Sequence, residues 1–386
     1  MMFEQTQTNW FCRWAQSSAM AWVGAVLICA MMMLSPHRQL SANESPDSGD
    51  AGDDRPLEAE IILILGARGS EEFDEVFAQS RHSLLGAARM APAKMHLIDV
   101  GQEKNENAGE DAPPAETGDA GTMKSRLVKV FEDLDRDGTL PLWIIMIGHG
   151  SYDSVDAKFN LEGPDISSVE LSGLLEGITR PTAIVLGFSS SSPFIKPLSG
   201  ANRVILSATK SGYEMNYARF GHYFADAFTN PEADFDKDDQ TSLLEAFIHA
   251  AATTRNFYES ENRLLTETAL IEDNGDGLGT PADWFNGLFI EKDAADGSQT
   301  DGLLAHRIIL IPSELERSLS LEDRDTRNSL ESELRALRKI KSSLTPEEYR
   351  SKLENIIGRI ARIYFPETTD EPNSNESSTG TDSEPN

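Results

Sequence analysis

Cysteine is nearly absent from this chain: Cys12 and Cys29 are the two in 386 residues, and both lie near the N-terminus. Positions 30–386 therefore hold no thiol for a disulfide or for nucleophilic catalysis. Positive charge is also scarce, because 34 Lys and Arg oppose 64 Asp and Glu, which gives a net charge of −30. Phosphate backbones require a basic face, so this charge argues against nucleic acid and against an anionic membrane surface as partners.

Long apolar runs are rare, and one of them, Ala19 to Leu34, contains no charged residue. As a helix this run would span about 24 Å, slightly less than the roughly 30 Å hydrocarbon core of a bilayer. We predict that residues 1–42 are either an uncleaved membrane anchor or a cleaved secretory signal. Both hypotheses place the rest of the chain outside the cytoplasm, membrane-anchored or secreted.

Three segments are acidic and poor in large apolar side chains: 43–57, 101–121 and 366–386. Such compositions cannot bury enough apolar surface to offset the entropy lost on ordering. We predict a disordered linker, a disordered insertion and a disordered tail, respectively.

The remainder of the chain alternates between apolar runs and amphipathic segments. Continuous apolar runs, which are typical of strands buried on both faces, occur at 60–66, 95–100, 142–148, 182–188 and 203–207. Helical spacing of apolar residues occurs between them, at 71–90, 122–134 and 167–178. This alternation predicts an α/β domain over 58–300 with a mostly parallel sheet that helices cover on both faces.

A different pattern begins near residue 312 and continues to 365. Leucines at helical spacing precede Thr345, Pro346 and Glu348, which have the order of an N-cap, a first helical residue and a capping box. A second apolar stripe follows, so we predict a C-terminal α-helical hairpin. Its apolar faces can pack on the domain or on each other, or mediate self-association.

Two polar residues follow neighbouring apolar runs of the predicted sheet. His149 comes directly after 142–148, and Ser189 comes directly after 182–188. In open α/β sheets, ligands bind at the carboxyl ends of the strands. Both residues are therefore candidates for a functional site at that edge.

The sequence around His149 resembles a known peptidase family. Gly148-His149-Gly150-Ser151, followed by 158–161 and 165–166, resembles the His-Gly region of legumain-like (peptidase C13, haemoglobinase-type) cysteine peptidases, which share the caspase fold. The resemblance implies a caspase-like three-layer α/β/α sandwich with a peptide-binding cleft at the strand ends. It also implies that His149 is the base, that Gly150 supplies an oxyanion-hole amide and that Ser189 occupies the catalytic Cys position.

The same resemblance places Ser207, Thr209 and Glu214 at the primary specificity pocket. A serine hydroxyl is much less acidic than a thiol, so it needs a well-aligned base and an oxyanion hole. Our leading hypothesis is a catalytically degenerate protein that binds peptides or partner proteins. The alternative is an active serine-type hydrolase that uses Ser189 and His149.

A second enzymatic hypothesis treats the segment 187–191 as a nucleophile elbow, although it lacks the second glycine of the G-x-S-x-G motif. The triad order of those hydrolases requires a histidine later in the chain. The three available are His222, His249 and His306.

The segment 234–245 matches the positions of an EF-hand loop. Oxygen ligands fall at positions 1, 3, 5, 7, 9 and 12, namely Asp234, Asp236, Asp238, Gln240 through its carbonyl, Ser242 and Glu245. Hard oxygen ligands at these positions are what Ca²⁺ requires, although Asp239 replaces the usual glycine at position 6. Ca²⁺ is therefore the predicted cofactor, and a calcium-responsive adhesion or scaffold module is a third hypothesis. The alternative is an acidic loop that caps the helix beginning at Leu243.

Overall fold

The computed structural model describes residues 57–69, 74–99, 121–290 and 300–365. The predicted anchor lies outside these residues. So do the predicted linker, insertion and tail, except for Leu57 and Gly121. Among the helices of the described ranges, none is both long and apolar enough to cross a membrane.

The centre of the fold is a seven-stranded sheet in the order β10-β9-β8-β7-β3-β1-β2. Five strands are parallel: β1 (Ala59–Leu65), β2 (Ala93–Ile98), β3 (Leu142–Gly148), β7 (Thr182–Phe188) and β8 (Arg203–Ser207). Two short strands, β9 (Leu270–Glu272) and β10 (Thr280–Pro281), extend the sheet in antiparallel pairing. Every residue of β1, β3 and β7 is buried, as their continuous apolar sequences predicted.

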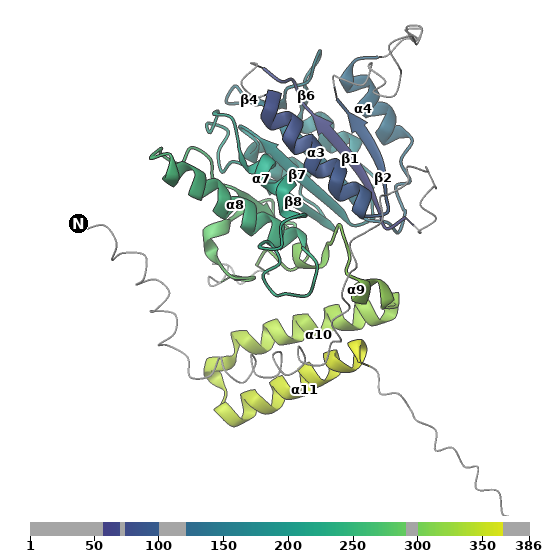
Figure 1. The fold of residues 1–386 in the computed structure, drawn as a ribbon, viewed down its shortest axis with the longest axis vertical. Coiled ribbons are helices and arrows are strands. Elements are labelled where there is room, and N and C mark those ends of the chain that lie inside the picture. The colour runs from purple at the N-terminus through teal and green to yellow at the C-terminus, as the bar shows by residue number, and fades with distance from the viewer. Residues whose placement is uncertain (1–56, 70–73, 100–120, 291–299, 366–386) are drawn as a thin grey trace, which may run out of the picture. The chain divides into compact units, whose positions relative to one another are not determined.

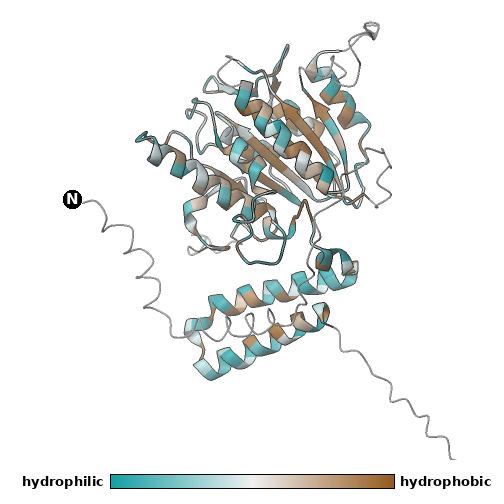
Figure 2. Cartoon of the chain, viewed as in Figure 1, coloured by the Kyte–Doolittle hydropathy of each residue, from teal (hydrophilic) through white to brown (hydrophobic). Residues whose placement is uncertain are grey.

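Helices cover both faces of this sheet (Figure 1). One layer contains α3 (Asp74–Met90), α7 (Phe220–Ala227) and α8 (Leu243–Ser260); the other contains α4 (Met123–Glu132), α5 (Ser168–Leu174) and α6 (Ile195–Leu198). Successive strand residues point to opposite faces, so Trp143 joins the core under α7 whereas Leu142 joins the core under α4. Figure 2 shows the apolar sheet between the layers. The predicted three-layer α/β/α sandwich is confirmed.

The C-terminal helices also form as predicted. After α9 (Glu314–Ser318), helices α10 (Leu321–Lys339) and α11 (Pro346–Tyr364) pack together around Leu330, Leu337 and Ile356. Thr345 and Glu348 form the capping box that starts α11. A contact also joins the hairpin to the α/β domain, because Arg307 donates hydrogen bonds to the Asn328 carbonyl and to Ser332 Oγ.

Several short elements have no counterpart in the sequence prediction. Directly after His149, three strands form a small antiparallel sheet: β4 (Gly150–Tyr152), β5 (Ala157–Phe159) and β6 (Ile166–Ser167). A second small hairpin pairs β11 (Phe285–Asn286) with β12 (Phe289–Ile290). The remaining elements are the 3-10 turns η2 (Ser192–Phe194), η3 (Ala282–Trp284), η4 (Ala305–Arg307) and η5 (Lys341–Ser343).

Candidate functional site

The sheet register places His149 and Ser189 beside each other. Strands β3 and β7 are parallel neighbours, and Gly148 pairs with Phe188, so the next residue of each strand lies at the carboxyl edge of the sheet. The glycine at position 150 is required here, because a Cβ atom on Gly150 would lie 2.2 Å from the Ser189 carbonyl oxygen. The predicted site residues therefore converge in the fold, and their side chains decide what they can do.

The Ser189 hydroxyl is bonded to the Gly150 backbone. The Gly150 N–H donates to Ser189 Oγ over 3.1 Å, and Ser189 Oγ donates to the Gly150 carbonyl over 3.1 Å. Within the described residues, Ser189 makes no hydrogen bond with His149. Ser189, the predicted nucleophile, therefore has no hydrogen-bonded base. Its Oγ also accepts a hydrogen bond from the Gly150 amide, which was predicted to stabilise an oxyanion.

His149 points toward the α3 and α7 side of the sheet. Its ring centroid lies 5.4 Å from that of Tyr217 and 6.2 Å from that of Phe77. Burial lowers the pKa of His149 below its ordinary value, although a hydrogen bond with the Arg68 backbone acts in the opposite direction. The imidazole is therefore neutral at pH 7. The Asp153 carboxylate accepts hydrogen bonds from the amides of Val155 and Asp156 in its own turn.

The later histidines predicted for a hydrolase elbow lie away from the serine run. His222 Nδ1 is 3.1 Å from Ser80 Oγ, and His249 Nε2 is 3.3 Å from the Asn230 amide. Among the described residues, none of His222, His249 and His306 forms a hydrogen bond with residues 189–191. None of these histidines is therefore placed to act as the base that the nucleophile-elbow hypothesis requires.

Ser190 has a strained conformation that the sequence did not predict. Its φ of 58° lies in the left-handed region, which serine rarely adopts. The residue is 1% exposed, and its Oγ has no hydrogen-bond partner among the described residues. Strain of this kind concentrates at binding and active sites, where the surrounding structure enforces it. No local sequence signal marks it, because Gly and Asn, rather than Ser, are the residues that favour this region.

Replacing Ser190 with glycine is expected to stabilise the protein by about 1 kcal/mol, because glycine adopts a positive φ without steric cost and no hydrogen bond is lost. The matched control is Ser192→Gly in the same run, because Ser192 does not have a positive φ. Its expected effect is neutral or destabilising. Urea unfolding of both variants measures the difference. Destabilisation by Ser190→Gly would show that the hydroxyl or Cβ makes a favourable contact.

The three residues predicted for the specificity pocket instead support a loop. Ser207 and Thr209 are fully buried, and their hydroxyls lie 2.8 Å and 3.1 Å from Ser191 Oγ. The Glu214 carboxylate accepts hydrogen bonds from the amides of Lys210 and Thr268. Since these polar groups bond to one another and to the backbone, they hold the segment 207–214 in place, and their predicted contact with a ligand stays a prediction.

A cavity of about 640 Å³ lies next to His149 and was not predicted. Its lining includes Tyr217, whose ring packs on His149, together with Asn216, Arg219, Arg263 and the 87% exposed Leu264. These residues come from the loop before α7 and from the segment after α8. Tyr213 and Met215, on the same loop, are also exposed apolar side chains. This edge of the sheet therefore combines a hollow with accessible apolar surface.

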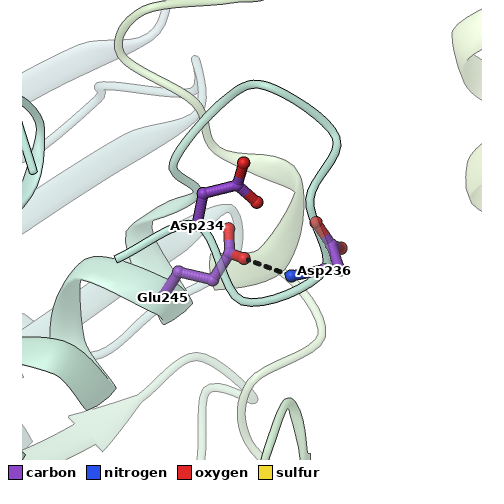
Figure 3. A group of neighbouring side chains, drawn as sticks. All are labelled: Asp234, Asp236 and Glu245. Atoms are coloured by element: carbon purple, nitrogen blue, oxygen red, sulfur yellow. Dashed lines mark hydrogen bonds between the residues drawn. The ribbon is translucent and has the colours of Figure 1, made fainter. Parts of the chain in front are cut away.

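The EF-hand-like loop brings part of its predicted ligand set together. Carboxylate oxygens of Asp234, Asp236 and Glu245 all lie within 4.8 Å of one another (Figure 3). Asp239, at the position usually held by glycine, has a φ of +64°, which is the conformation that a glycine would supply there. Three oxygens at this spacing are suited to a hard divalent cation such as Ca²⁺.

The other predicted ligands are partly used within the loop. The Ser242 hydroxyl and amide both donate to the Glu245 carboxylate, which forms the capping box at the start of α8. The Gln240 side-chain amide donates to Asp238 over 2.7 Å. Glu245 Oε1 also accepts hydrogen bonds from the amides of Phe235 and Asp236, so both oxygens of this carboxylate are already bonded within the loop and a cation would compete with these bonds.

The charges in this loop repel one another. Burial, followed by the charges of Asp238, Glu245 and Asp234, raises the pKa of Asp236 to about 8. Burial and the neighbouring carboxylates also raise the pKa of Asp238 to about 6. A bound cation or bound protons would relieve this repulsion, so the donor set fits a cation on electrostatic grounds as well as on geometry.

Solved structures that are similar to this chain include two caspases. No family model and no curated protein matches the chain. The Drosophila initiator caspase Dronc has 10% sequence identity and a TM-score of 0.38, with 63% of this chain and 93% of that chain covered. Caspase-1 from Spodoptera frugiperda has 9% identity and a TM-score of 0.34, with 56% and 85% covered. At these values the likeness concerns the fold alone and assigns neither family nor activity.

Proposed function

We propose that this chain is an exported, caspase/legumain-like protein that has lost thiol catalysis and binds peptides or partner proteins at the carboxyl edge of its sheet. The predicted segment 19–34 would serve as its anchor or signal. One observation carries the proposal: the Ser189 hydroxyl exchanges hydrogen bonds with Gly150 and makes none with His149.

Chemistry supports this preference for binding over catalysis. Serine nucleophiles need a base within hydrogen-bond reach and a free oxyanion donor. Here Ser189 has no base, and its own oxygen occupies the Gly150 N–H. Leu264 in the lining of the cavity, and Tyr213 and Met215 on the loop before α7, are exposed apolar side chains suited to contacting a peptide.

The full chain is expected to bind peptides saturably without cleaving them. Replacing Leu264 with serine removes apolar surface at the cavity and is expected to weaken binding by about tenfold. The control is Leu321→Ser, a similarly exposed leucine at the start of α10, with unchanged affinity expected. Calorimetry with a mixed peptide library, followed by mass spectrometry of the recovered peptides, measures both properties. If neither Leu264→Ser nor Leu321→Ser changes the affinity, the peptide does not bind at this edge of the sheet.

The enzymatic alternative uses Ser189 as a nucleophile and His149 as its base. It is favoured by the paired strand ends, because a rotation of the Ser189 side chain away from Gly150 could bring Oγ toward the imidazole. A serine-directed electrophile tests it. Covalent labelling of Ser189 that is lost in His149→Ala would support the hydrolase, and its absence would support the binding protein.

A calcium-responsive module is the second candidate function, and contacts between the loop and the C-terminal segment favour it. Ser313, the N-cap of α9, donates its backbone N–H to Gln240 Oε1 over 3.1 Å. Ser242 forms a β-bridge with Ile309. Cation binding at 234–245 would therefore stiffen the segment that leads into the helical hairpin, through which a partner or a second copy could bind.

A further inference from the structure

The helical hairpin formed by α10 and α11 has only a small core of its own (Figure 1). The buried apolar residues of this core are Leu330, Leu337 and Ile356. Six further apolar side chains pack against these three and stay partly exposed, namely Leu334, Leu344, Tyr349, Leu353, Ile360 and Ile363. Amphipathic helices of this kind bury their apolar faces more completely when they pack with further helices in a bundle.

One flank of the hairpin carries an open groove between the two helices, with a volume of about 570 Å³. The floor of the groove is apolar. Leu337 and Ile356 are buried there, whereas Ala336 and Ile340 are exposed, Ile340 to 47%. The positions of α10 to which Arg307 of the α/β domain donates hydrogen bonds do not line this groove. Accessible apolar surface in a hollow of this size is a candidate contact site.

The two rims of the groove carry opposite charges. The charged lining residue is Glu333 on α10 and Lys352 on α11. A two-fold axis that lays α10 of one copy on α11 of another therefore brings an acidic rim against a basic rim twice. Glu333 also pairs with Arg359 of α11 over 3.0 Å, and because both side chains are about half exposed, this pair can form within one copy or between two.

The helices of the hairpin lack the strong negative charge of the whole chain. Helix α10 contains five acidic and five basic residues, and α11 contains three acidic and four basic residues. The chain as a whole has a net charge of −30. Two copies repel each other through that charge, whereas two hairpins can approach each other without it. A second copy is therefore the partner that this groove fits electrostatically.

The size of the hairpin face limits the strength of such a contact. Each helix has 19 residues and is therefore about 28 Å long at 1.5 Å per residue. Two helices about 10 Å apart present a face roughly 20 Å wide, so two copies would bury on the order of 1,100 Å² in total. Specific interfaces begin near about 1,000 Å², so we expect a weak, reversible dimer with a Kd of about 10 µM.

We propose that this groove is a self-association site, in which the hairpins of two copies pack as a four-helix bundle with α10 of each copy against α11 of the other. The bundle covers Ala336 and Ile340, and it sets the rim that carries Glu333 against the rim that carries Lys352 in the other copy. The proposal selects one of the partners left open above for the hairpin. It depends on neither peptide binding nor calcium.

Sedimentation equilibrium of the full chain in a mild non-ionic detergent, from about 1 to about 100 µM, measures this association. We expect the protein mass to rise with concentration from 42.4 kDa toward twice that value. Ala336→Glu places a charge on the groove floor with a good helix former, and it is expected to raise the Kd at least about tenfold. The matched control is Ala361→Glu, an exposed alanine of α11 outside the groove, with an unchanged Kd expected.

A second pair of variants repeats the test without adding charge. Ile340 and Ile357 are 47% and 50% exposed, but only Ile340 lines the groove. Ile340→Ser removes apolar surface that the dimer would bury in both copies, so the Kd is expected to rise about tenfold. Ile357→Ser should leave the Kd unchanged.

Reversal of the rim charges tests the arrangement of the two copies. Glu333→Lys or Lys352→Glu alone gives both rims the same charge and is expected to raise the Kd about fivefold. The double change restores rims of opposite charge and should recover most of the wild-type affinity. A role of these residues within one hairpin alone would not give this recovery.

Two results would overturn the proposal. A wild-type chain that stays at 42.4 kDa up to about 100 µM would do so, whether the groove is open or is covered by another part of the same chain, such as the apolar run 19–34. Association that is equally strong in Ala336→Glu and Ala361→Glu would place the contact outside the groove. Neither result changes the peptide titrations described above, so the proposed function is tested separately.

Discussion

Replacing Arg180 with methionine is expected to destabilise the protein by about 3 kcal/mol at pH 7, because it leaves a buried carboxylate without its buried partner. The side chains of Arg180 and Glu60 are 2% and 5% exposed, and Arg180 donates to Glu60 Oε2 over 2.6 Å. Lys94 and His96 also contact this carboxylate, at 2.9 Å and 2.8 Å. Because they remain after the substitution, the expected loss of stability is at the lower end of values for broken buried ion pairs. The cluster lies at the amino end of β1, opposite the candidate cleft.

The pH dependence of this effect has a definite sign. Burial alone would raise the pKa of Glu60, but hydrogen bonds from His96, Lys94 and Arg180 lower it to about 2. A carboxyl group with a depressed folded pKa stabilises the protein above its unfolded pKa, near 4.5, and this contribution is lost as the pH falls toward 2. Without Arg180 the Glu60 pKa rises, so the difference between variant and wild type should narrow below about pH 4.

Chemical denaturation at pH 7 and at about pH 2.5 measures both effects. The control is Lys94→Met, whose 53% exposed ammonium contacts the same carboxylate and is expected to contribute less than about 1 kcal/mol. Equal costs for the two substitutions would contradict the assignment of Arg180 as the principal partner of Glu60.

Saturating Ca²⁺ is expected to stabilise the protein by about 3 kcal/mol at a free concentration of roughly one hundred times its Kd. Without a cation, the raised pKa values of Asp236, about 8, and Asp238, about 6, mean that the folded loop retains protons. A carboxyl group whose pKa is raised by folding stabilises the folded state below its unfolded pKa, here near 3.8. This stabilisation is lost as the pH rises through the folded pKa values, about 6 for Asp238 and about 8 for Asp236. Stability without calcium should therefore fall between about pH 4 and pH 8, and calcium should remove this decline.

Thermal unfolding with and without Ca²⁺ across this pH range tests the loop. Asp234→Ala removes one of the three convergent carboxylates and should abolish the response, whereas Glu354→Ala, an exposed acid of α11, should not. Hydrogen exchange of residues 308–313 gives a second measurement, because calcium should slow it if the loop holds the segment before the hairpin. An unchanged unfolding midpoint and pH profile would exclude the calcium hypothesis.

The sheet was predictable from the sequence because its main strands are buried on both faces. A strand with two covered faces needs apolar residues at every position, so β1, β3 and β7 appear as continuous runs. The start of α8 was predictable for a different reason, since Ser242 and Glu245 have capping-box spacing. Strands β4 to β6 contain two or three residues each, too few to show any periodicity.

The chemistry of the site was less predictable than its position. The chain order places His149 and Ser189 at adjacent strand ends, but which group the Ser189 hydroxyl contacts depends on a side-chain rotation. The cavity could not be predicted from the sequence. Val76, Arg219 and Arg263 are far apart in the chain, and tertiary packing alone brings them together.

Peptide turnover by the full chain, compared between wild type and Ser189→Cys, is the most direct test of a peptide-binding cleft that has lost its nucleophile. A thiol at position 189 forms a thiolate far more readily than serine forms an alkoxide. We predict no turnover in wild type or Ser189→Ala. We predict turnover in Ser189→Cys, because a thiol bonds to Gly150 more weakly than the hydroxyl does and can rotate toward His149, and this turnover should be lost when His149 is also replaced by alanine. Turnover by wild type that Ser189→Ala abolishes would contradict the account and make this protein a serine hydrolase.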